Sequence, residues 1–293
     1  MALSVDPLWP RAGGWPAPTG GAVDLALVGL PTWRTSLSGS EAFTTPAAVR
    51  EALRFYTDFA GHTARSLSYE QWPDAIEPDD DPEGAIAYVA AAAANARLVV
   101  ALGGDNAATV AAALGTWGPR VGSAGLVTLD AHHDLRDGHS NGSPVRELIE
   151  AGLSGARVVQ VGIADFANSA DYARRAADYG ITVVHRDELH ARPMADVMAE
   201  ALELASAGGG PVHVDLDVDV CDRSVAPACP AALPGGIAAH ELRAAARAAG
   251  RHPAVESIDL TEVDAARDTP DARTIRLVAL CVLEAAAGLA ERP

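Results

Sequence analysis

Short apolar runs alternate with longer mixed stretches along most of the chain, and this pattern predicts an α/β fold. We expect strands over residues 23–30, 98–102, 125–129, 158–163, 181–185, 212–218 and 256–260. We expect helices over residues 46–55, 83–96, 107–114, 144–151, 169–179, 193–206, 239–249 and 271–289. The strand-like runs are apolar throughout, as is typical of strands covered on both faces. Their regular alternation with helices predicts a mostly parallel sheet with right-handed crossovers.

The pattern runs without interruption, which favours a single domain. We expect this domain to cover residues 23–293, behind a Pro- and Gly-rich N-terminal extension over residues 1–22. With 293 residues, of which 49% are hydrophobic, the chain is long enough to bury one large core. Apolar runs such as residues 86–96 are too short to span a bilayer, so we expect no membrane partner.

The net charge limits the kinds of partner that we expect, and the cysteine content indicates the cellular compartment. A formal net charge of −17 disfavours nucleic acid, because its phosphates would be repelled at long range. The odd number of cysteines, without closely spaced pairs, fits the reducing cytoplasm. We interpret Cys221, Cys229 and Cys281 as small buried residues or free thiols, although Cys221 and Cys229 flank an acidic cluster and leave a redox role open.

Metal-ligand residues follow three of the predicted strands. Asp130, His132 and Asp134 follow the run at residues 125–129. The others are Asp215, Asp217 and Asp219 at the run over residues 212–218, and Asp105 and Asn106 after residues 98–102. Sites in open parallel sheets lie beyond the carboxyl ends of the strands, so we expect these groups to meet. On an extended chain Asp130, His132 and Asp134 would share one side and His133 would face the other.

Such a cluster predicts a metal site. Unpaired carboxylates at close range repel one another, so a cation is needed to neutralise them. A site rich in oxygen and poor in imidazole favours Mn²⁺ or a similar ion over structural zinc. One carboxylate shared by two ions would set them at the spacing of two-metal hydrolases, which generate a nucleophile from water near neutral pH.

The motifs between residues 103 and 262 resemble the ureohydrolase superfamily of arginases, agmatinases, guanidinobutyrases and formiminoglutamases. The resemblance implies an arginase-like three-layer α/β/α sandwich with a mostly parallel sheet and two Mn²⁺ ions. The implied ligands of one ion are Asp130, Asp134 and Asp217, and those of the other are Asp130, His132, Asp217 and Asp219. The resemblance also implies that Glu262 contacts the cationic amidine or guanidine head of the substrate, whose planar N–H groups fit a carboxylate.

The chain departs from the family at two positions. Most relatives carry a histidine ligand of the first metal where this chain has Asn106. Either Asn106 coordinates through its amide oxygen, or the first ion binds weakly and the site is partly occupied. Arginases also place a proton-shuttle histidine where this chain has Asn141, so the proton for the leaving group comes from metal-bound water, His139 or His133.

These departures resemble formiminoglutamases of histidine degradation, as do the stretches at residues 140–146, 158–163, 166–169 and 220–230. The resemblance implies hydrolysis of N-formimino-L-glutamate to L-glutamate and formamide, with Asp219 accepting or steering the proton of the attacking hydroxide. The substrate carries two carboxylates, and the guanidinium groups of Arg136 and Arg146 are suited to hold them. Ser140 and Asn141 are further candidate substrate-binding residues in the same segment.

Two other functions stay open. The first is a guanidine hydrolase of the arginase, agmatinase or guanidinobutyrase type, which would release urea. The second is a catalytically silent relative that binds a metabolite, because the ligand histidine and the shuttle histidine are both replaced. In each case the expected partner is a small molecule. The resemblance further suggests a homo-oligomer, either a trimer or a hexamer.

Overall fold

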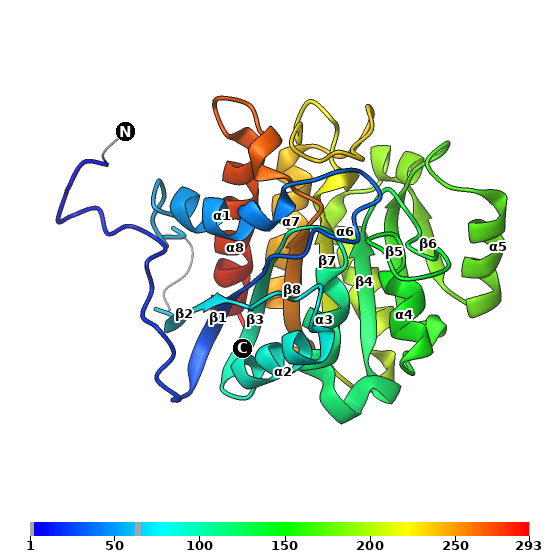
Figure 1. The fold of residues 1–293 in the computed structure, drawn as a ribbon, viewed down its shortest axis with the longest axis horizontal. Coiled ribbons are helices and arrows are strands. Elements are labelled where there is room, and N and C mark those ends of the chain that lie inside the picture. The colour runs from blue at the N-terminus through cyan, green and yellow to red at the C-terminus, as the bar shows by residue number, and fades with distance from the viewer. Residues whose placement is uncertain (1–2, 62–65, 293) are drawn as a thin grey trace.

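The computed structural model describes residues 3–61 and 66–292 (Figure 1). Residues 1 and 2 of the predicted extension, residue 293 of the predicted domain, and residues 62–65 lie outside the described residues. One sheet of eight strands runs through the molecule in the order β2-β1-β3-β8-β7-β4-β5-β6, and every neighbouring pair is parallel. The strands are β1 (Val23–Leu30), β2 (Tyr69–Asp74), β3 (Ala96–Gly103), β4 (Gly125–Leu129), β5 (Val158–Ile163), β6 (Thr182–His185), β7 (Val212–Asp217) and β8 (Val255–Thr261).

Helices cover both faces of the sheet. They are α1 (Thr45–Leu53), α2 (Pro82–Ala93), α3 (Ala108–Trp117), α4 (Pro144–Glu150), α5 (Ala170–Tyr179), α6 (Met194–Ala205), α7 (Ala239–Arg251) and α8 (Arg273–Ala290). Helices α1, α6, α7 and α8 pack together on one face, and α2, α3 and α4 pack on the other (Figure 1). This is the predicted three-layer α/β/α sandwich. Among the described helices, none combines the length and apolar character needed to cross a membrane.

The alternation of side chains along β1 shows why its residues are apolar throughout. Leu25 and Leu27 belong to the core under α1 and α8, whereas Ala26 and Val28 belong to the core under α2. Because successive side chains of a strand point to opposite faces, a strand between two helical layers needs apolar residues at every position. The same reasoning identified β1, β4 and β5 with their observed bounds.

The central strands depart from this rule on the face toward α3. Buried polar residues on that face include Thr128 on β4, His213 and Asp215 on β7, and Ser257 and Asp259 on β8. The His213 ring bonds to Ser257 Oγ at 2.7 Å and lies edge-on to Trp117 of α3. Asp215 shares the face of Asp217, as predicted, but its Oδ1 lies 3.3 Å from the hydroxyl oxygen of Thr261 one strand away. A buried polar row therefore leads through the core to the carboxyl edge of the sheet.

Several elements begin or end one to three residues from their predicted positions, and two differences have a clear physical cause. Strand β2 was not predicted, because Tyr69–Asp74 is a mostly polar run that contains Pro73. It pairs only with β1, at the edge of the sheet, where proline is tolerated. Helix α8 begins at Arg273 rather than residue 271, because Ala272 before it adopts a left-handed conformation with φ of 52°.

The described part of the predicted N-terminal extension runs beside β2. Trp15 stacks on Tyr69 with ring centroids 4.4 Å apart. The Gln71 N–H donates to Pro16 O at 2.8 Å, and the Thr19 N–H donates to the buried Glu70 carboxylate at 2.8 Å. Residues 3–22 form no helix or strand, yet they cover the edge that β2 would otherwise expose.

Candidate functional site

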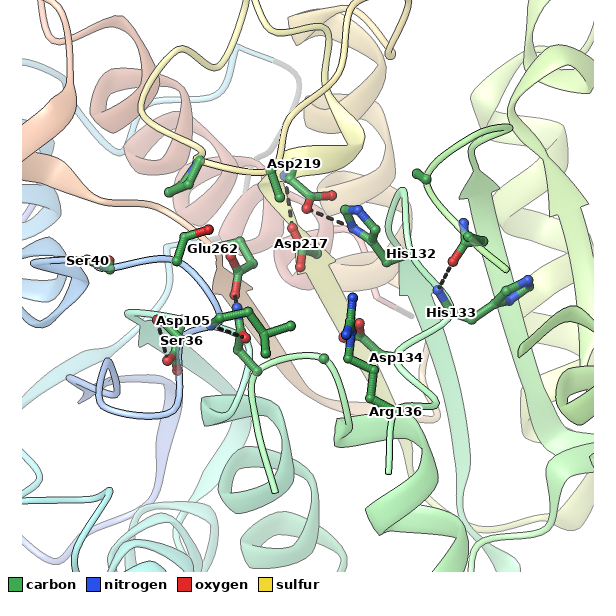
Figure 2. A pocket seen from close by; sticks show the side chains of 18 of the residues that line it. Ser36, Ser40, Asp105, His132, His133, Asp134, Arg136, Asp217, Asp219 and Glu262 are labelled. Atoms are coloured by element: carbon green, nitrogen blue, oxygen red, sulfur yellow. Dashed lines mark hydrogen bonds and ion pairs between the residues drawn. The ribbon is translucent and has the colours of Figure 1, made fainter. Parts of the chain in front are cut away.

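The three predicted clusters meet at the carboxyl edge of the sheet. The strands that carry them lie in the order β3-β8-β7-β4, so their carboxyl ends are neighbours. A cavity of about 420 Å³ opens above these ends (Figure 2). Its lining includes His132, Asp134, Asp217, Asp219 and Glu262.

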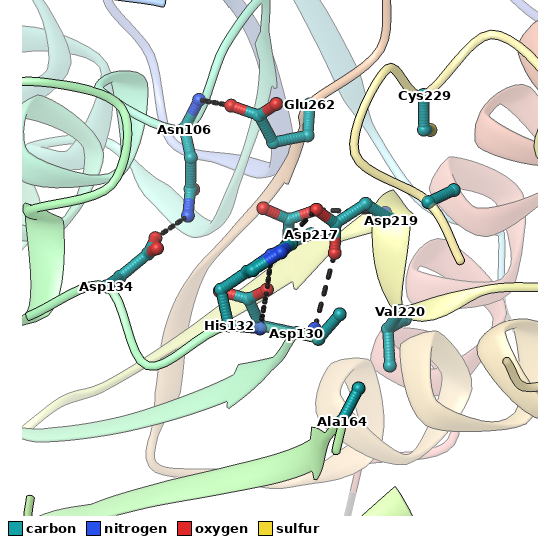
Figure 3. Close-up of polar contacts among 12 residues, drawn as sticks. Asn106, Asp130, His132, Asp134, Ala164, Asp217, Asp219, Val220, Cys229 and Glu262 are labelled. Atoms are coloured by element: carbon teal, nitrogen blue, oxygen red, sulfur yellow. Dashed lines mark hydrogen bonds and ion pairs between the residues drawn. The ribbon is translucent and has the colours of Figure 1, made fainter. Parts of the chain in front are cut away.

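Two sets of ligand atoms lie close enough to hold metal ions. Asp130, Asp134 and Asp217 offer carboxylate oxygens within 4.8 Å of one another. Asp130, His132 and Asp219 form a second set within the same limit. Asp130 belongs to both sets, so its carboxylate lies close to the other donors of each set (Figure 3). These sets agree with the ligands implied by the sequence, except that Asp217 joins only the first of them.

The donors fit a cation. Asp130 Oδ2 is buried and has no hydrogen-bond partner among the described residues, which is costly for an oxygen that carries negative charge. Burial, reinforced by neighbouring carboxylates, raises the pKa of Asp130 to about 6 and the pKa values of Asp134 and Asp217 well above their ordinary value. Without a metal, these groups therefore retain protons to higher pH than an exposed carboxyl group does. Carboxylates with one imidazole are a donor set that Mn²⁺ accepts.

His132 and Asp219 form a close pair within the cluster. His132 Nδ1 lies 3.0 Å from Asp219 Oδ2. Burial alone would lower the pKa of His132, but Asp219 and Asp130 outweigh it and raise the pKa to about 12. Conversely, His132 holds the pKa of Asp219 below its ordinary value despite burial. A metal ion would replace the proton that His132 carries in this pair.

The loop after β4 is not extended as predicted, because Asp134 has a left-handed φ of 52°. The loop is fixed by Asn168, whose Oδ1 accepts the His133 N–H at 2.9 Å and whose Nδ2 donates to Ala131 O at 2.9 Å. His133 points away from Asp217 (Figure 2), and its Nδ1 lies 2.7 Å from Gln160 Oε1. Side-chain hydrogen bonds, rather than strand alternation, therefore separate His133 from the cluster.

Asn106 lies between the carboxylates of Asp134 and Glu262 (Figure 3). Its Nδ2 donates to Asp134 Oδ2 at 2.5 Å, and its backbone N–H donates to Glu262 Oε1 at 2.8 Å. Its amide oxygen accepts hydrogen bonds from the hydroxyls of Thr109 at 2.6 Å and Thr261 at 3.0 Å. The amide oxygen thus faces two hydroxyl groups, and the amide nitrogen faces the cluster.

Glu262 follows β8 in a left-handed conformation, with φ of 59°. Its Oε1 also accepts a hydrogen bond of 2.6 Å from Asn141 Nδ2. Burial, with additional repulsion from Asp105 and Asp219, raises the pKa of Glu262 to about 8. None of the hydrogen bonds found among the described residues uses Oε2, so this oxygen is available to a ligand in the cavity.

The predicted substrate residues divide into two groups. Arg136 and Asn141 line the cavity. Arg146 lies outside the lining, where its guanidinium donates to Arg136 O at 2.6 Å and to Gly138 O. His139 and Ser140 also lie outside it; His139 Nδ1 is 3.1 Å from Glu147, and the Ser140 N–H donates to Ser143 Oγ at 2.9 Å.

One wall of the cavity was not predicted from the sequence. Ser36, Leu37, Ser38 and Ser40, which follow β1, line the side nearest Glu262. Asp264, two residues after Glu262, is buried there as well. The available signal was positional, because the carboxyl end of every central strand contributes to such a site.

The comparisons with known proteins agree with this geometry. The Arginase family model matches residues 23–288. A formimidoylglutamase of Halobacterium salinarum is 31% identical over 274 residues, which cover 90% of this chain and 88% of that protein. The crystal structure of the formimidoylglutamase of Bacillus subtilis superposes with a TM-score of 0.91 and 25% identity, over 100% of this chain and 95% of that one.

A Trypanosoma cruzi formiminoglutamase solved with Mn²⁺ has the same fold, with a TM-score of 0.81 and 24% identity over 92% of this chain and 95% of that one. The family match extends over most of the chain, from β1 to the last turns of α8. It includes every strand end that contributes to the carboxylate cluster. The chain therefore belongs to the arginase family.

Proposed function

We propose that this protein is a manganese-dependent hydrolase that converts N-formimino-L-glutamate to L-glutamate and formamide. The observation that carries the proposal is one cavity that joins the cluster around Asp130 to the carboxylate of Glu262 and the guanidinium of Arg136. These groups match the three demands of the substrate, which are an electrophilic carbon, a cationic amidine and two carboxylates. The formimidoylglutamases of Halobacterium salinarum and Bacillus subtilis support the choice of substrate.

Asp130, Asp134 and Asp217 would hold one Mn²⁺, and Asp130, His132 and Asp219 would hold a second. The Trypanosoma cruzi formiminoglutamase, which was solved with Mn²⁺, supports this choice of metal. When bound, such ions polarise the substrate and lower the pKa of water toward neutrality. Asp219 would accept or steer a proton of the attacking water, because its carboxylate lines the cavity beside His132.

Glu262 would bind the amidinium through Oε2. Its Oε1 is already occupied by two N–H donors, from Asn106 and Asn141, which fix the direction of the carboxylate. The buried position of Glu262 strengthens its attraction to a cationic head group, because little water screens the pair. Binding of the amidinium would also favour the ionised form of this carboxyl group.

Arg136 would bind a substrate carboxylate. It is the one arginine that lines the cavity among the described residues, and no described carboxylate forms an ion pair with it. A guanidinium presents paired N–H donors that match a carboxylate. Arg146 would act indirectly, because its bonds to the carbonyls of Arg136 and Gly138 hold the loop that carries Arg136.

Asn106 would support the first metal site rather than bind the ion. Its amide nitrogen donates to Asp134, and two threonine hydroxyls hold its oxygen away from the cluster. The first ion would then lack a protein ligand at this position and would bind more weakly than if a histidine stood there. This arrangement favours the second of the two alternatives left open by the sequence.

A substrate panel tests the proposal. Protein loaded with Mn²⁺ would be incubated separately with N-formimino-L-glutamate, arginine, agmatine and 4-guanidinobutyrate, and glutamate, formamide and urea would be measured. We expect turnover of the formimino substrate alone. Release of urea from a guanidine without turnover of formiminoglutamate would reject this substrate and retain the family. Absence of turnover in protein that binds Mn²⁺ would favour a silent relative.

A further inference from the structure

The wall segment, defined as residues 35–41, connects β1 to the first helices and forms the side of the cavity next to Glu262. It contains no helix or strand, so its position depends on contacts outside the segment. Leu37 is 58% exposed, which shows that the hydrophobic core does not hold it. Hydrogen bonds to side chains that follow β3 and β8 and to the side chain of Asn141 hold the segment instead, and the Asn141 N–H also donates to Thr35 O at 3.3 Å.

Two of these bonds anchor the ends of the wall segment. Ser36 Oγ donates to Asp105 Oδ2 at 2.7 Å, just after β3. The Glu41 N–H donates to Asp264 Oδ2 at 3.0 Å, just after β8. Arg267 ties the same region, because it pairs with Asp264 and donates to Gly39 O. Both anchors are buried carboxylates beside the cluster.

The third bond connects the wall segment to Glu262 through one side chain. Asn141 Oδ1 accepts the Leu37 N–H at 3.0 Å, and Asn141 Nδ2 donates to Glu262 Oε1 at 2.6 Å. A single amide group therefore spans from the wall to the carboxylate that faces the substrate. The lack of a side chain at Gly142 allows Leu37 and Arg136 to pack closely against this loop, because a Cβ there would lie 2.7 Å from Arg136 Cδ and 3.3 Å from Leu37 Cδ1.

We propose that Asn141 is a positioning residue that holds the wall segment and Glu262 at a fixed separation, and that this separation selects formimino over guanidino head groups. The inference rests on the proposed function. A guanidino group carries an amino group where a formimino group carries hydrogen, so it needs more room beside Glu262. A rigid wall excludes that extra group, whereas a loose wall gives way to it. Asn141 thus acts through the shape of the site and transfers no proton.

Two substitutions at Asn141 separate its two bonds. Asn141→Asp retains an oxygen that accepts the Leu37 N–H but loses the donor to Glu262. Asn141→Ala loses both bonds. Ser36→Ala removes a different anchor and leaves the bond to Glu262 in place. Asn95→Ala, at an exposed asparagine between α2 and β3, is the matched control.

The first readout is hydrogen–deuterium exchange of the wall segment, which needs no turnover. We expect faster exchange of residues 35–41 in Asn141→Ala and Ser36→Ala, and exchange close to that of the unmodified protein in Asn141→Asp and Asn95→Ala. Wall exchange that is unchanged in Asn141→Ala would overturn the proposal. Thermal unfolding and bound Mn²⁺ would establish that each variant is folded. If Asn141→Ala does not fold, Ser36→Ala still tests whether a loosened wall admits the guanidino group, and a faster-exchanging wall with unchanged selectivity in that variant would overturn the proposal.

The second readout is selectivity between N-formimino-L-glutamate and N-amidino-L-glutamate, which differ only in the head group. The ratio of their kcat/KM values, or of their dissociation constants if one is not turned over, should fall roughly tenfold in Asn141→Ala. The fall should be smaller in Ser36→Ala and absent in Asn95→Ala. In Asn141→Asp, kcat/KM should fall for both ligands because Glu262 loses a donor and gains a like charge. A faster-exchanging wall with an unchanged ratio would refute the selection.

The result expected if the proposed function is wrong differs from the result expected if only the role of Asn141 is wrong. An unmodified protein that does not hydrolyse the formimino substrate would reject that function. The exchange rates and the two dissociation constants would still decide whether Asn141 couples the wall segment to ligand choice.

Discussion

The cavity has two sides that are built in different ways. On the metal side, Asp217 is the last residue of β7 and Asp130 directly follows β4, so the register of two paired strands sets their positions. On the substrate side, the wall segment and the loop at residues 136–146 contain little regular structure, and polar side chains hold them from outside. The metal side is buried, and the substrate side is partly exposed.

Because the two sides are held in place differently, we expect mutations on the metal side and on the substrate side to have different effects. Removal of a residue on the metal side leaves buried charges without a partner, because the strand ends cannot move apart. Removal of a residue on the substrate side frees a loop that can adjust. We therefore expect large effects on all reactions from the first group, and smaller effects that depend on the substrate from the second. The following experiments test this expectation in decreasing order of effect.

Asp130→Ala should have the largest effect, because Asp130 belongs to both ligand sets. We expect kcat/KM to fall by on the order of 10³-fold or more for every substrate, since the metal supplies several kcal/mol of stabilisation to the transition state. Bound Mn²⁺ should fall in parallel. Asp178→Ala on the exposed face of α5 is the control. Substantial turnover in the Asp130 variant would show that the ligand assignment is wrong.

Arg136→Gln should weaken only substrates that carry a carboxylate. Hydrogen bonds to charged groups contribute about 1.5–3 kcal/mol, so we expect kcat/KM for formiminoglutamate to fall roughly 10- to 100-fold, mainly through KM. Bound Mn²⁺ should not change. Arg174→Gln, at an arginine 67% exposed on α5, is the matched control. An equal rise in the dissociation constants of agmatine and of formiminoglutamate would contradict the assigned role.

Much of the metal side could be predicted from the sequence because each ligand lies within five residues of an apolar strand. The substrate side could not be predicted in the same way. His139, Ser140 and Arg146 lie close in sequence to Asn141, yet the turn at residues 138–143 directs them outside the cavity lining. Ser36 is about a hundred residues before Asn141, and only the tertiary hydrogen bonds bring the wall segment to Glu262. Spacing along the chain carries no information about such contacts.

Variants at Asn106 test whether this residue supports Asp134 or binds the metal ion directly. If Asn106 supports Asp134, then Asn106→Ala and Thr109→Val should both weaken the first Mn²⁺ site, by roughly tenfold or more for the alanine variant. If its amide oxygen were a ligand, Thr109→Val would free that oxygen and would not weaken binding. Protein from which metal has been removed with a chelator would be titrated with Mn²⁺ and the binding measured by calorimetry, which distinguishes the two roles of Asn106. Thr116→Val, at a hydroxyl on α3 that bonds only to Ala112 O, is the control.

The raised carboxyl pKa values predict how pH affects metal-free protein. Burial and neighbouring charges raise the pKa of Asp130 to about 6 and that of Glu262 to about 8. In the unfolded chain both groups titrate near pH ~4, so between these limits the folded state binds more protons. The stability that they contribute is present at low pH and is lost as pH rises through 6 and then 8. We expect the Tm of chelated protein to fall by several degrees between about pH 5 and 8.

Mn²⁺ supplies the control for this pH dependence. Because the ions bind ionised carboxylates, saturating Mn²⁺ should raise Tm more at high pH than at low pH. A Tm of chelated protein that rises over the same range would show that these carboxyl groups are ionised in the folded state without metal. That result would remove the electrostatic reason for a cation at the site.

His139 should show the smallest effect, and it tests the boundary of the substrate side. The side chain is 51% exposed and lies outside the cavity lining, with Nδ1 3.1 Å from Glu147. A positioned proton donor contributes roughly 10²- to 10⁴-fold to rate, so its removal would be unmistakable. We expect His139→Ala to keep kcat within about twofold of that of the unmodified protein. His190→Ala, at an exposed histidine of the segment Arg186–His190, is the control and should give the same result. A hundredfold loss would mean that the loop moves when substrate binds and brings His139 into the cavity, and the substrate side would then include a mobile catalytic group.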